Sequence, residues 1–184
     1  LRDEFYKINP LPAWVPKGKG PLLIVMGGSQ GAKRINEIFY ESLNFLIKQN
    51  FRIVHIIGEN NLDSSLKIKS NNYIQKTFTN HIAPLMQNCD LVISRSGAGT
   101  VNELIKTGKP SILIPYPNSK NNHQEKNAMI LSSIGGAILI NQNKITKLFF
   151  EETLKRIFKV KLKKGKPKYE ILDLMRKTMI NFDT

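Results

Sequence analysis

The segment Ser94-Arg95-Ser96-Gly97-Ala98-Gly99-Thr100-Val101-Asn102-Glu103 decides the fold predicted for this chain. It follows the apolar run Leu91-Val92-Ile93, and apolar residues recur after it at helical spacing. The pattern therefore predicts a strand, a tight glycine turn and a helix that begins at Thr100. Glycine lets the backbone turn sharply and approach a ligand closely. We expect the amides of the helix start and the Glu103 carboxylate to face one crevice, where a carboxylate could accept hydrogen bonds from a sugar.

A purely structural alternative fits the same residues. Thr100 and Glu103 have the spacing of a capping box, in which both side chains satisfy amides at the end of a helix. These ten residues alone leave the binding and the capping interpretations open.

Apolar runs alternate with helical patterns along the rest of the chain. Runs typical of buried parallel strands occupy residues 22–26, 52–57, 73–78, 111–114 and 137–140. Apolar residues recur at helical spacing from Ile35 to Ile47, and further helices are expected at residues 81–88, 124–133, 146–158 and about 168–180. This alternation predicts an α/β fold, a Rossmann-like doubly wound parallel sheet with right-handed crossovers.

Three polar turns follow strands of this sheet, at residues 27–32, 94–100 and 115–124. Ligands of doubly wound sheets bind outside the carboxyl ends of the strands. The turn formed by Gly27, Gly28, Ser29, Gln30 and Gly31 could cradle a diphosphate, because glycines admit the phosphate and the following helix supplies positive potential. It matches neither the Walker loop nor the full dinucleotide fingerprint, and a turn in which Ser29 merely caps the helix is the alternative.

Two amide side chains stand one turn apart at the start of the helix predicted at 124–133. Gln124 and Asn127 share a helix face, and amides both donate and accept hydrogen bonds, which suits sugar hydroxyls. An amide-rich helix start also occurs as a simple cap, so the pattern has low specificity. His55 is expected to be structural, His81 to start a helix and His123 to be solvated.

Composition narrows the classes of protein. The chain has 184 residues, 41% of them hydrophobic, which fits one soluble globular domain with a tail. The single Cys89 is expected to be a buried reduced thiol, which favours a cytoplasmic location. No signal peptide is recognisable, and no His, Cys or Asp cluster has metal-ligand spacing, so we expect no metal and no cofactor.

The formal net charge of +14 indicates an anionic partner. Residues 155–177 hold ten Lys or Arg and only two acids. A solvated loop is one interpretation of this basic segment, and attraction to an anionic membrane surface is another. Nucleic acid is disfavoured as a partner because no set of aromatic residues interleaves the charges.

Five motifs occur in the order found in a known family: Gly27-Gly-Ser-Gln-Gly-Ala32, Ser94 to Glu103, Gly108-Lys-Pro110, Ile114-Pro-Tyr-Pro117 and Asn122-His-Gln-Glu-Lys-Asn-Ala128. Over roughly residues 1–158 the chain resembles the MurG family of bacterial transferases. These enzymes add N-acetylglucosamine (GlcNAc) to an undecaprenyl-diphosphate-linked muramyl-pentapeptide in peptidoglycan synthesis. The resemblance implies a GT-B glycosyltransferase and, in this chain, the half that binds the donor UDP-GlcNAc.

The resemblance also implies roles for single residues. Ser29 matches a serine that contacts the diphosphate, Glu103 a carboxylate that binds the ribose, and Gln124 a glutamine that contacts the donor sugar. Arg2 matches the arginine that ends the interdomain linker, and Thr79 falls where the main chain contacts uracil. The turn around the phosphates comprises Ala98, Gly99, Thr100, Val101 and Asn102.

The family's amino-terminal acceptor domain has no counterpart in this sequence. We therefore expect residues 1–20 to be an interdomain linker, 21–158 the nucleotide-sugar domain and 159–184 a basic loop and helix. The donor half supplies no evident base for the acceptor hydroxyl, so its catalytic residue is unassigned and turnover by this chain alone is not expected. The resemblance implies a peripheral location on the inner face of the plasma membrane.

Two other functions remain open at this point. One is a subunit of a split GlcNAc transferase, completed by a separate membrane-bound chain. The other is a nucleotide-sugar binder without catalysis.

Overall fold

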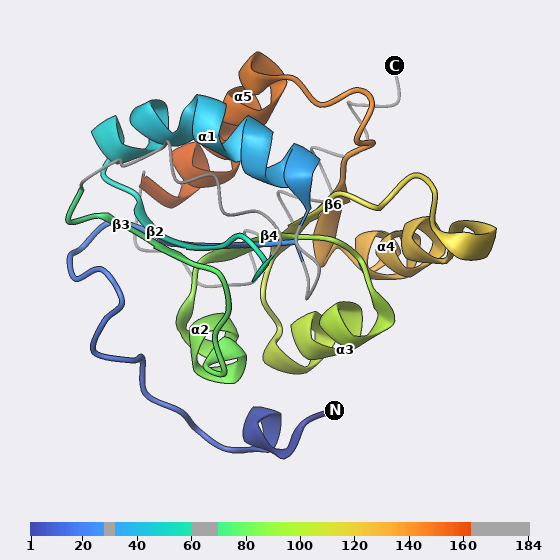
Figure 1. Ribbon diagram of the computed structural model, residues 1–184, viewed down its shortest axis with the longest axis horizontal. Coiled ribbons are helices and arrows are strands. Elements are labelled where there is room, and N and C mark those ends of the chain that lie inside the picture. Colours follow the sequence, from blue (N-terminus) through green and yellow to red (C-terminus); the bar gives the residue numbers. More distant parts are fainter. Residues whose placement is uncertain (28–31, 60–69, 163–184) are drawn as a thin grey trace.

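The structure, a computed structural model, describes residues 1–27, 32–59 and 70–162. The described part of the chain forms one parallel sheet of six strands with helices on both faces (Figure 1). Its elements in chain order are η1 (Asp3–Tyr6), β1 (Leu22–Met26), α1 (Lys33–Lys48), β2 (Arg52–Ile56), β3 (Tyr73–Lys76), α2 (Ile82–Asn88), β4 (Leu91–Ser94), α3 (Ala98–Thr107), β5 (Ser111–Leu113), η3 (Lys120–Asn122), α4 (His123–Ser133), β6 (Ala137–Leu139) and α5 (Lys147–Leu162).

The strand order is β3-β2-β1-β4-β5-β6, and every neighbouring pair is parallel. This confirms the predicted doubly wound sheet. The chain runs from β1 outward to β3 and then returns to place β4 on the other side of β1. The crevice of such a fold lies outside the carboxyl ends of the strands at this reversal, here after Met26 and Ser94.

Alternate residues of the central strands pack into two hydrophobic cores, one on each face of the sheet. In β1, Leu23 and Val25 pack with α1 and α5 on one face, whereas Leu22, Ile24 and Met26 pack with α2, α3 and α4 on the other. Figure 1 shows the same division, with α1 and α5 above the sheet and α2 and α3 below it. Strands buried on both faces explain the continuous apolar runs of the sequence.

The ends of several elements differ from the predicted ones. Helix α3 begins at Ala98 instead of Thr100, because Gly97 serves as its N-cap. It ends as predicted at Gly108, whose φ of 58° is a left-handed conformation that glycine adopts without strain. Helix α5 runs to Leu162 and so crosses the predicted boundary at 158/159, while the helix predicted at 168–180 lies outside the described residues.

The expected linker is packed against the domain. Phe5 and Val15 are buried in the core beside α2 and α3. The Gln87 side chain accepts a hydrogen bond from the Asn9 backbone amide at 3.1 Å. This packing positions Arg2, the one residue of the first 20 that lines the cavity described below.

A buried polar network lies between α1 and β2. The His55 ring is 3.0 Å from Asn36 Oδ1 at Nε2 and 3.2 Å from the Tyr73 hydroxyl at Nδ1. The Asn36 amide nitrogen donates to the Ile57 carbonyl, so its oxygen faces His55 and accepts the Nε2 proton. Burial lowers the pKa of His55 from 6.5 to about 3. The buried ring and its two polar contacts agree with the predicted structural role.

The neutral His55 makes the stability of the domain depend on pH. Below pH 6.5 the unfolded chain binds a proton at His55 that the folded chain does not bind until about pH 3, so stability falls with pH across that window. Between pH 7 and 5 the free energy of unfolding should fall by about 2 kcal/mol through this residue. In urea titrations at both pH values, His55→Gln should remove that part of the fall and the exposed His123→Gln should retain it. Equal pH dependence in the two variants would contradict the assignment.

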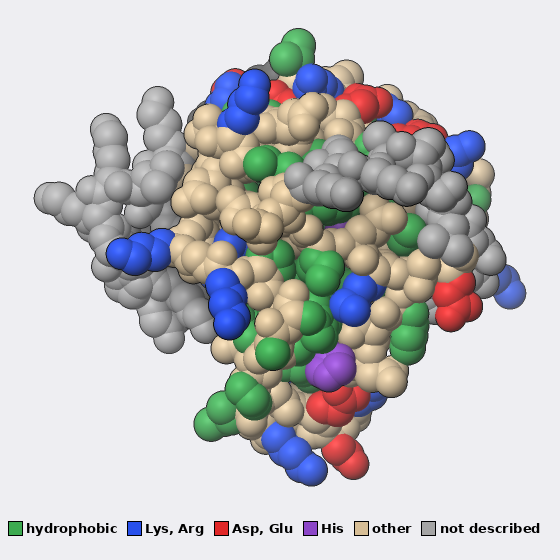
Figure 2. All heavy atoms as spheres, turned by 60° about the vertical axis from the view of Figure 1, so that its left-hand side comes forward, with side chains coloured by type: hydrophobic (Ala, Val, Ile, Leu, Met, Phe, Trp, Pro, Cys, Tyr) green, Lys and Arg blue, Asp and Glu red, His purple; other side chains and the backbone are tan. Residues whose placement is uncertain are grey.

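Cations are dispersed over the face of the molecule that Figure 2 presents. Lys and Arg side chains there stand apart, between hydrophobic, acidic and other atoms. Most of the basic segment at 159–184 lies outside the described residues. Over the residues that were described, none of the helices has the length and apolarity required to span a bilayer.

Candidate functional site

Four of the predicted site residues meet in one cavity at the carboxyl edge of the sheet. The cavity, hereafter the Glu103 cavity, has a volume of about 240 Å³. Its lining comprises Arg2, Met26, Ile56, Thr77, Phe78, Thr79, Ile82, Thr100 and Glu103. Apolar side chains from β1, β2 and α2 form part of its wall, and charged groups stand at one side. This combination suits a flat ring with a polar substituent.

The charged side of the cavity is an ion pair between residues distant in sequence. Arg2 Nη2 lies 2.9 Å from Glu103 Oε1, and the Glu103 side chain is only 13% exposed against 46% for Arg2. The Arg2 guanidinium also lies 5.2 Å from the centre of the Phe5 ring and 3.7 Å from Glu4. The pair fixes one carboxylate oxygen of Glu103, and a carboxylate has further lone pairs with which to accept hydrogen bonds.

The capping interpretation of Thr100 and Glu103 is wrong. Gly97 occupies the N-cap, so Thr100 is the third residue of α3 and lines the cavity instead of capping the helix. The first backbone bond of the helix runs from the Val101 amide to the Gly97 carbonyl at 3.0 Å. The amides of Ala98, Gly99 and Thr100 precede that bond and have no carbonyl within α3 to bind.

The glycines of this turn leave room instead of meeting protein atoms. A Cβ built on Gly97 or Gly99 would have no atom within 4 Å. Packing within the described chain therefore does not require glycine there. Open space beside free helix amides is the arrangement expected of an anion site.

The remaining residues of the segment face elsewhere. Val101 turns its side chain into the core, where it is 5% exposed, and its amide is used within the helix. We therefore expect Val101 to support α3 instead of contacting a ligand. Asn102 is exposed on α3 and does not line the cavity.

The Thr79 side chain forms a hydrogen bond within its own loop. Its hydroxyl accepts a hydrogen bond from the His81 amide at 3.1 Å, next to the start of α2. The contact of the Thr79 main chain with a base stays a prediction. His81 stands at the N-cap of α2, as predicted for a residue that starts a helix.

Gln124 and Asn127 both reach the loops at the carboxyl ends of strands. Gln124 Oε1 accepts a hydrogen bond from the Tyr116 amide at 3.0 Å, and Asn127 Nδ2 donates to the Ser96 carbonyl at 3.1 Å. These contacts leave the Gln124 amide nitrogen and the Asn127 oxygen as groups that could bind a ligand. Gly27 is buried directly after β1, whereas Gly28, Ser29, Gln30 and Gly31 lie outside the described residues.

Arg95 is a residue of the site to which sequence reasoning assigned no role. Its guanidinium donates to the Ile114 carbonyl at 2.9 Å and the Pro115 carbonyl at 3.0 Å, and to Gln142 Oε1 at 2.5 Å. It also lies 5.5 Å from the centre of the Tyr116 ring. Burial lowers the pKa of Arg95, and the neighbouring Tyr116 opposes that shift. One side chain thus ties together the loops after β4, β5 and β6.

Removing the Arg95 side chain and its hydrogen bonds should destabilise the domain. Arg95→Met leaves two backbone carbonyls without their donor, so the free energy of unfolding should fall by about 2 kcal/mol, roughly 4–8 °C in Tm. Arg95→Lys should recover part of the loss, since lysine retains the charge without the planar fork. Arg34→Met, which removes an arginine that is 39% exposed and donates to one backbone carbonyl, is the matched control and should cost less than about 1 kcal/mol. If thermal unfolding gave Arg95→Met the same Tm as Arg34→Met, this role of Arg95 would be refuted.

Over the described residues, no three or more His, Cys, Asp or Glu side chains lie together in a way that could hold a metal ion. Cys89 is buried, and its thiol lies 3.4 Å from the Met86 carbonyl, as expected for a structural thiol. The groups described above in the Glu103 cavity and the turns beside it are a carboxylate, two arginines, amides and helix N–H groups. Such groups bind and orient a ligand with hydroxyls and phosphates.

Comparison with known proteins agrees with this geometry. A relative from Prochlorococcus marinus strain CCMP1986 is 83% identical over all 184 residues and is named UDP-N-acetylglucosamine–N-acetylmuramyl-(pentapeptide) pyrophosphoryl-undecaprenol N-acetylglucosamine transferase. A relative of the same name from strain MIT 9211 is 42% identical over 179 residues. The chain spans about half the length of each, 50% in both cases.

Solved structures share the fold at lower identity. The crystal structure of Acinetobacter baumannii MurG matches 96% of this chain and 47% of its own, with a TM-score of 0.65 and 24% identity. The calicheamicin glycosyltransferase CalG4 matches 93% of this chain and 42% of its own, with a TM-score of 0.67 and 16% identity. The family described as "Glycosyltransferase family 28 C-terminal domain" matches residues 22–177. The chain therefore belongs to the family of glycosyltransferase family 28 C-terminal domains.

Proposed function

We propose that this chain is the UDP-GlcNAc-binding half of a transferase that moves GlcNAc onto a lipid-diphosphate-linked muramyl-pentapeptide, converting lipid I to lipid II. The observation that carries the proposal is the Arg2–Glu103 pair in a cavity of a family 28 domain that is 83% identical to a transferase of that name. The acceptor side and the catalytic base would come from the half of the relatives that this chain does not span.

Each group at the carboxyl edge has a part in this proposal. The free oxygen of Glu103 would accept hydrogen bonds from the ribose hydroxyls, and the apolar wall of the Glu103 cavity would hold uracil against the Thr79 main chain. The amides at the start of α3, with Ser29 and its glycine turn, would bind the diphosphate. The free amide nitrogen of Gln124 and the oxygen of Asn127 would orient the sugar.

The described residues would act by binding and orientation. Amides and a helix N-terminus directed at the diphosphate stabilise the negative charge that develops on the leaving group as the glycosidic bond breaks. Holding the sugar in place lowers the entropic barrier to attack by the acceptor hydroxyl. Because the acceptor is lipid-linked, the proposal includes a peripheral location on the inner face of the plasma membrane, supported by the net charge of +14.

Calorimetric titration tests the proposal. The chain should bind UDP-GlcNAc and UDP and should not bind GDP-mannose. Gln124→Ala should weaken UDP-GlcNAc binding and leave UDP binding unchanged, because only the sugar contacts that residue. The same titrations are repeated with the chain joined to the amino-terminal half of the strain CCMP1986 relative. If neither the chain alone nor the joined protein bound UDP-GlcNAc, the proposal would be refuted.

Transfer assays with the joined protein also distinguish the proposed transferase from a nucleotide-sugar binder without catalysis. Transfer of GlcNAc to the lipid-linked acceptor is expected from the joined form. Donor binding without transfer in that form would favour the nucleotide-sugar binder. Transfer that requires a separate membrane-bound chain would favour the split enzyme.

A further inference from the structure

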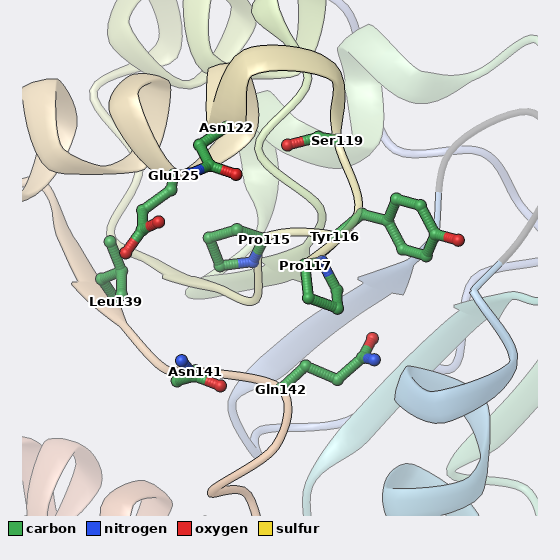
Figure 3. A pocket seen from close by; sticks show the side chains of 9 residues that line it. All are labelled: Pro115, Tyr116, Pro117, Ser119, Asn122, Glu125, Leu139, Asn141 and Gln142. Atoms are coloured by element: carbon green, nitrogen blue, oxygen red, sulfur yellow. The ribbon is translucent and has the colours of Figure 1, made fainter.

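A second cavity lies at the same edge of the sheet, between the loop after β5 and the segment after β6 (Figure 3). Its volume is about 210 Å³, and its lining comprises Pro115, Tyr116, Pro117, Ser119, Asn122, Glu125, Leu139, Asn141 and Gln142. It shares no lining residue with the Glu103 cavity. We call it the amide pocket because three of its side chains are primary amides.

Polar groups without a partner among the described residues line the amide pocket. Glu125 and Asn122 come from the start of α4, and neither side chain has a hydrogen bond within the described part of the chain. Gln142 uses its oxygen to accept from Arg95, which leaves its amide nitrogen to donate elsewhere. A carboxylate that only accepts thus stands in one cavity with amides that donate and accept.

The walls of the amide pocket are apolar and stiff. Two prolines and Leu139 provide carbon surface, and Tyr116 is 45% exposed beside them. In Figure 3, Tyr116 and Gln142 extend to one side of the cavity, while Glu125 and Leu139 lie at the other. Apolar surface between hydrogen-bonding groups matches a sugar ring, which has C–H faces and an equator of hydroxyls.

The loop that forms the pocket is fixed by several contacts. Arg95 donates to the Pro115 carbonyl and to Gln142, and the Ser119 hydroxyl accepts a hydrogen bond from the backbone amide of Gln124 at 3.3 Å. Asn122 has a φ of 53°, in the left-handed region that asparagine tolerates better than most residues. A preformed pocket loses less entropy when a ligand binds.

Charge and size restrict the ligand. Glu125 is the one charged residue in the lining, so an anionic ligand would be repelled. One carboxylate also falls short of the ligand set of a metal site, in agreement with the absence of such a cluster from the described residues. The volume is below the roughly 300–1,000 Å³ of pockets for drug-sized molecules and suits a single ring.

From these features we infer that the amide pocket binds one neutral sugar ring, distinct from the sugar of the nucleotide donor. Glu125 accepts hydrogen bonds from its hydroxyls, Asn122 and the Gln142 amide nitrogen bind its remaining polar groups, and the proline and leucine surface contacts its C–H face. The site goes beyond the proposed donor function, because it uses none of the residues assigned to UDP-GlcNAc.

The test follows backbone and side-chain amide signals by two-dimensional NMR while free N-acetylglucosamine is added to the full chain. The titration is done with saturating UDP-GlcNAc, so the donor site is already filled. Shifts should appear at Asn122, Asn141 and Gln142, with a dissociation constant in the millimolar range. Glu125→Ala should weaken this binding about tenfold or more, and Asn122→Gly, which retains the left-handed backbone, should weaken it as well. Glu41→Ala, at an exposed position on α1, is the matched control and should leave it unchanged.

Three results would overturn the inference. One is the absence of shifts at the amide pocket throughout the titration. Another is the appearance of those shifts in a parallel titration without UDP-GlcNAc and their loss when UDP-GlcNAc is present, since the pocket would then hold the donor sugar. The third is much tighter binding of glucosamine, the same ring with an ammonium group, which would make Glu125 part of a cation site. Binding of UDP-GlcNAc itself is read separately, so failure of the donor proposal would not be mistaken for failure of this one.

Discussion

Glu103→Ala should weaken the binding of UDP-GlcNAc about 30-fold, because a hydrogen bond to a charged group contributes about 2 kcal/mol. The carboxylate is held by Arg2 at 2.9 Å and is mostly buried at the wall of the cavity. In the proposed complex it contacts the ribose, so the binding of UDP should fall by the same factor as that of UDP-GlcNAc. Isothermal titration calorimetry with both ligands measures the two ratios.

The matched control is Glu37→Ala, which removes a carboxylate that is also paired with an arginine but whose side chain is 43% exposed on α1. It should leave both affinities unchanged. An Arg2→Ala variant separates direct binding from support of the linker. If Glu103 acted only by holding Arg2, then Arg2→Ala, Glu103→Ala and the double variant would weaken UDP equally. A loss confined to UDP-GlcNAc would place the carboxylate at the sugar and contradict the ribose assignment.

Gly20→Ala should destabilise the fold by roughly 3 kcal/mol or more, which corresponds to a fall in Tm of roughly 6–12 °C. A Cβ at this position would lie 1.7 Å from the Asn50 carbonyl oxygen, and backbone cannot rotate away as a side chain could. Gly20 also offers its carbonyl to the Arg52 side chain at 2.7 Å. Any shift that relieved the clash would therefore disturb the start of β1 and β2.

Gly99→Ala provides the comparison for stability. A Cβ on Gly99 meets nothing within 4 Å, and alanine favours helix over glycine by up to about 1 kcal/mol. The Tm of this variant should stay the same or rise. Thermal unfolding followed by circular dichroism gives both values, and similar Tm values for the two variants would show that the Gly20 contact relaxes without cost.

The sequence by itself determined the fold class, and it predicted both the edge of the sheet that carries the candidate site and Glu103 as a candidate residue of that site. These follow from local information. Apolar runs buried on both faces read as parallel strands, and glycine turns after strands mark the carboxyl edge. The resemblance of the five motifs to the MurG family was also available without coordinates, and the matching family over residues 22–177 confirmed it.

The start of α3 was missed by two residues for a local reason. Gly97 and Gly99 are poor helix formers, so the pattern favoured a turn that continued to Thr100. Tertiary structure allows the helix to begin at Ala98, where the N-cap needs no side chain. The capping box failed with that boundary, since Thr100 then stands inside the helix.

Only the tertiary structure decided which distant residues meet. Arg2 and Glu103 are 101 positions apart, and Arg95 reaches Gln142 across 47 positions. Gly20 lies in a run that resembles a linker, yet it contacts the backbone before β2. Likewise, the amide pocket combines residues of the loop after β5, the start of α4 and the end of β6 with those that follow it, which no local pattern connects. Local preferences select strands, turns and helices, whereas a site depends on the packing that brings their ends together.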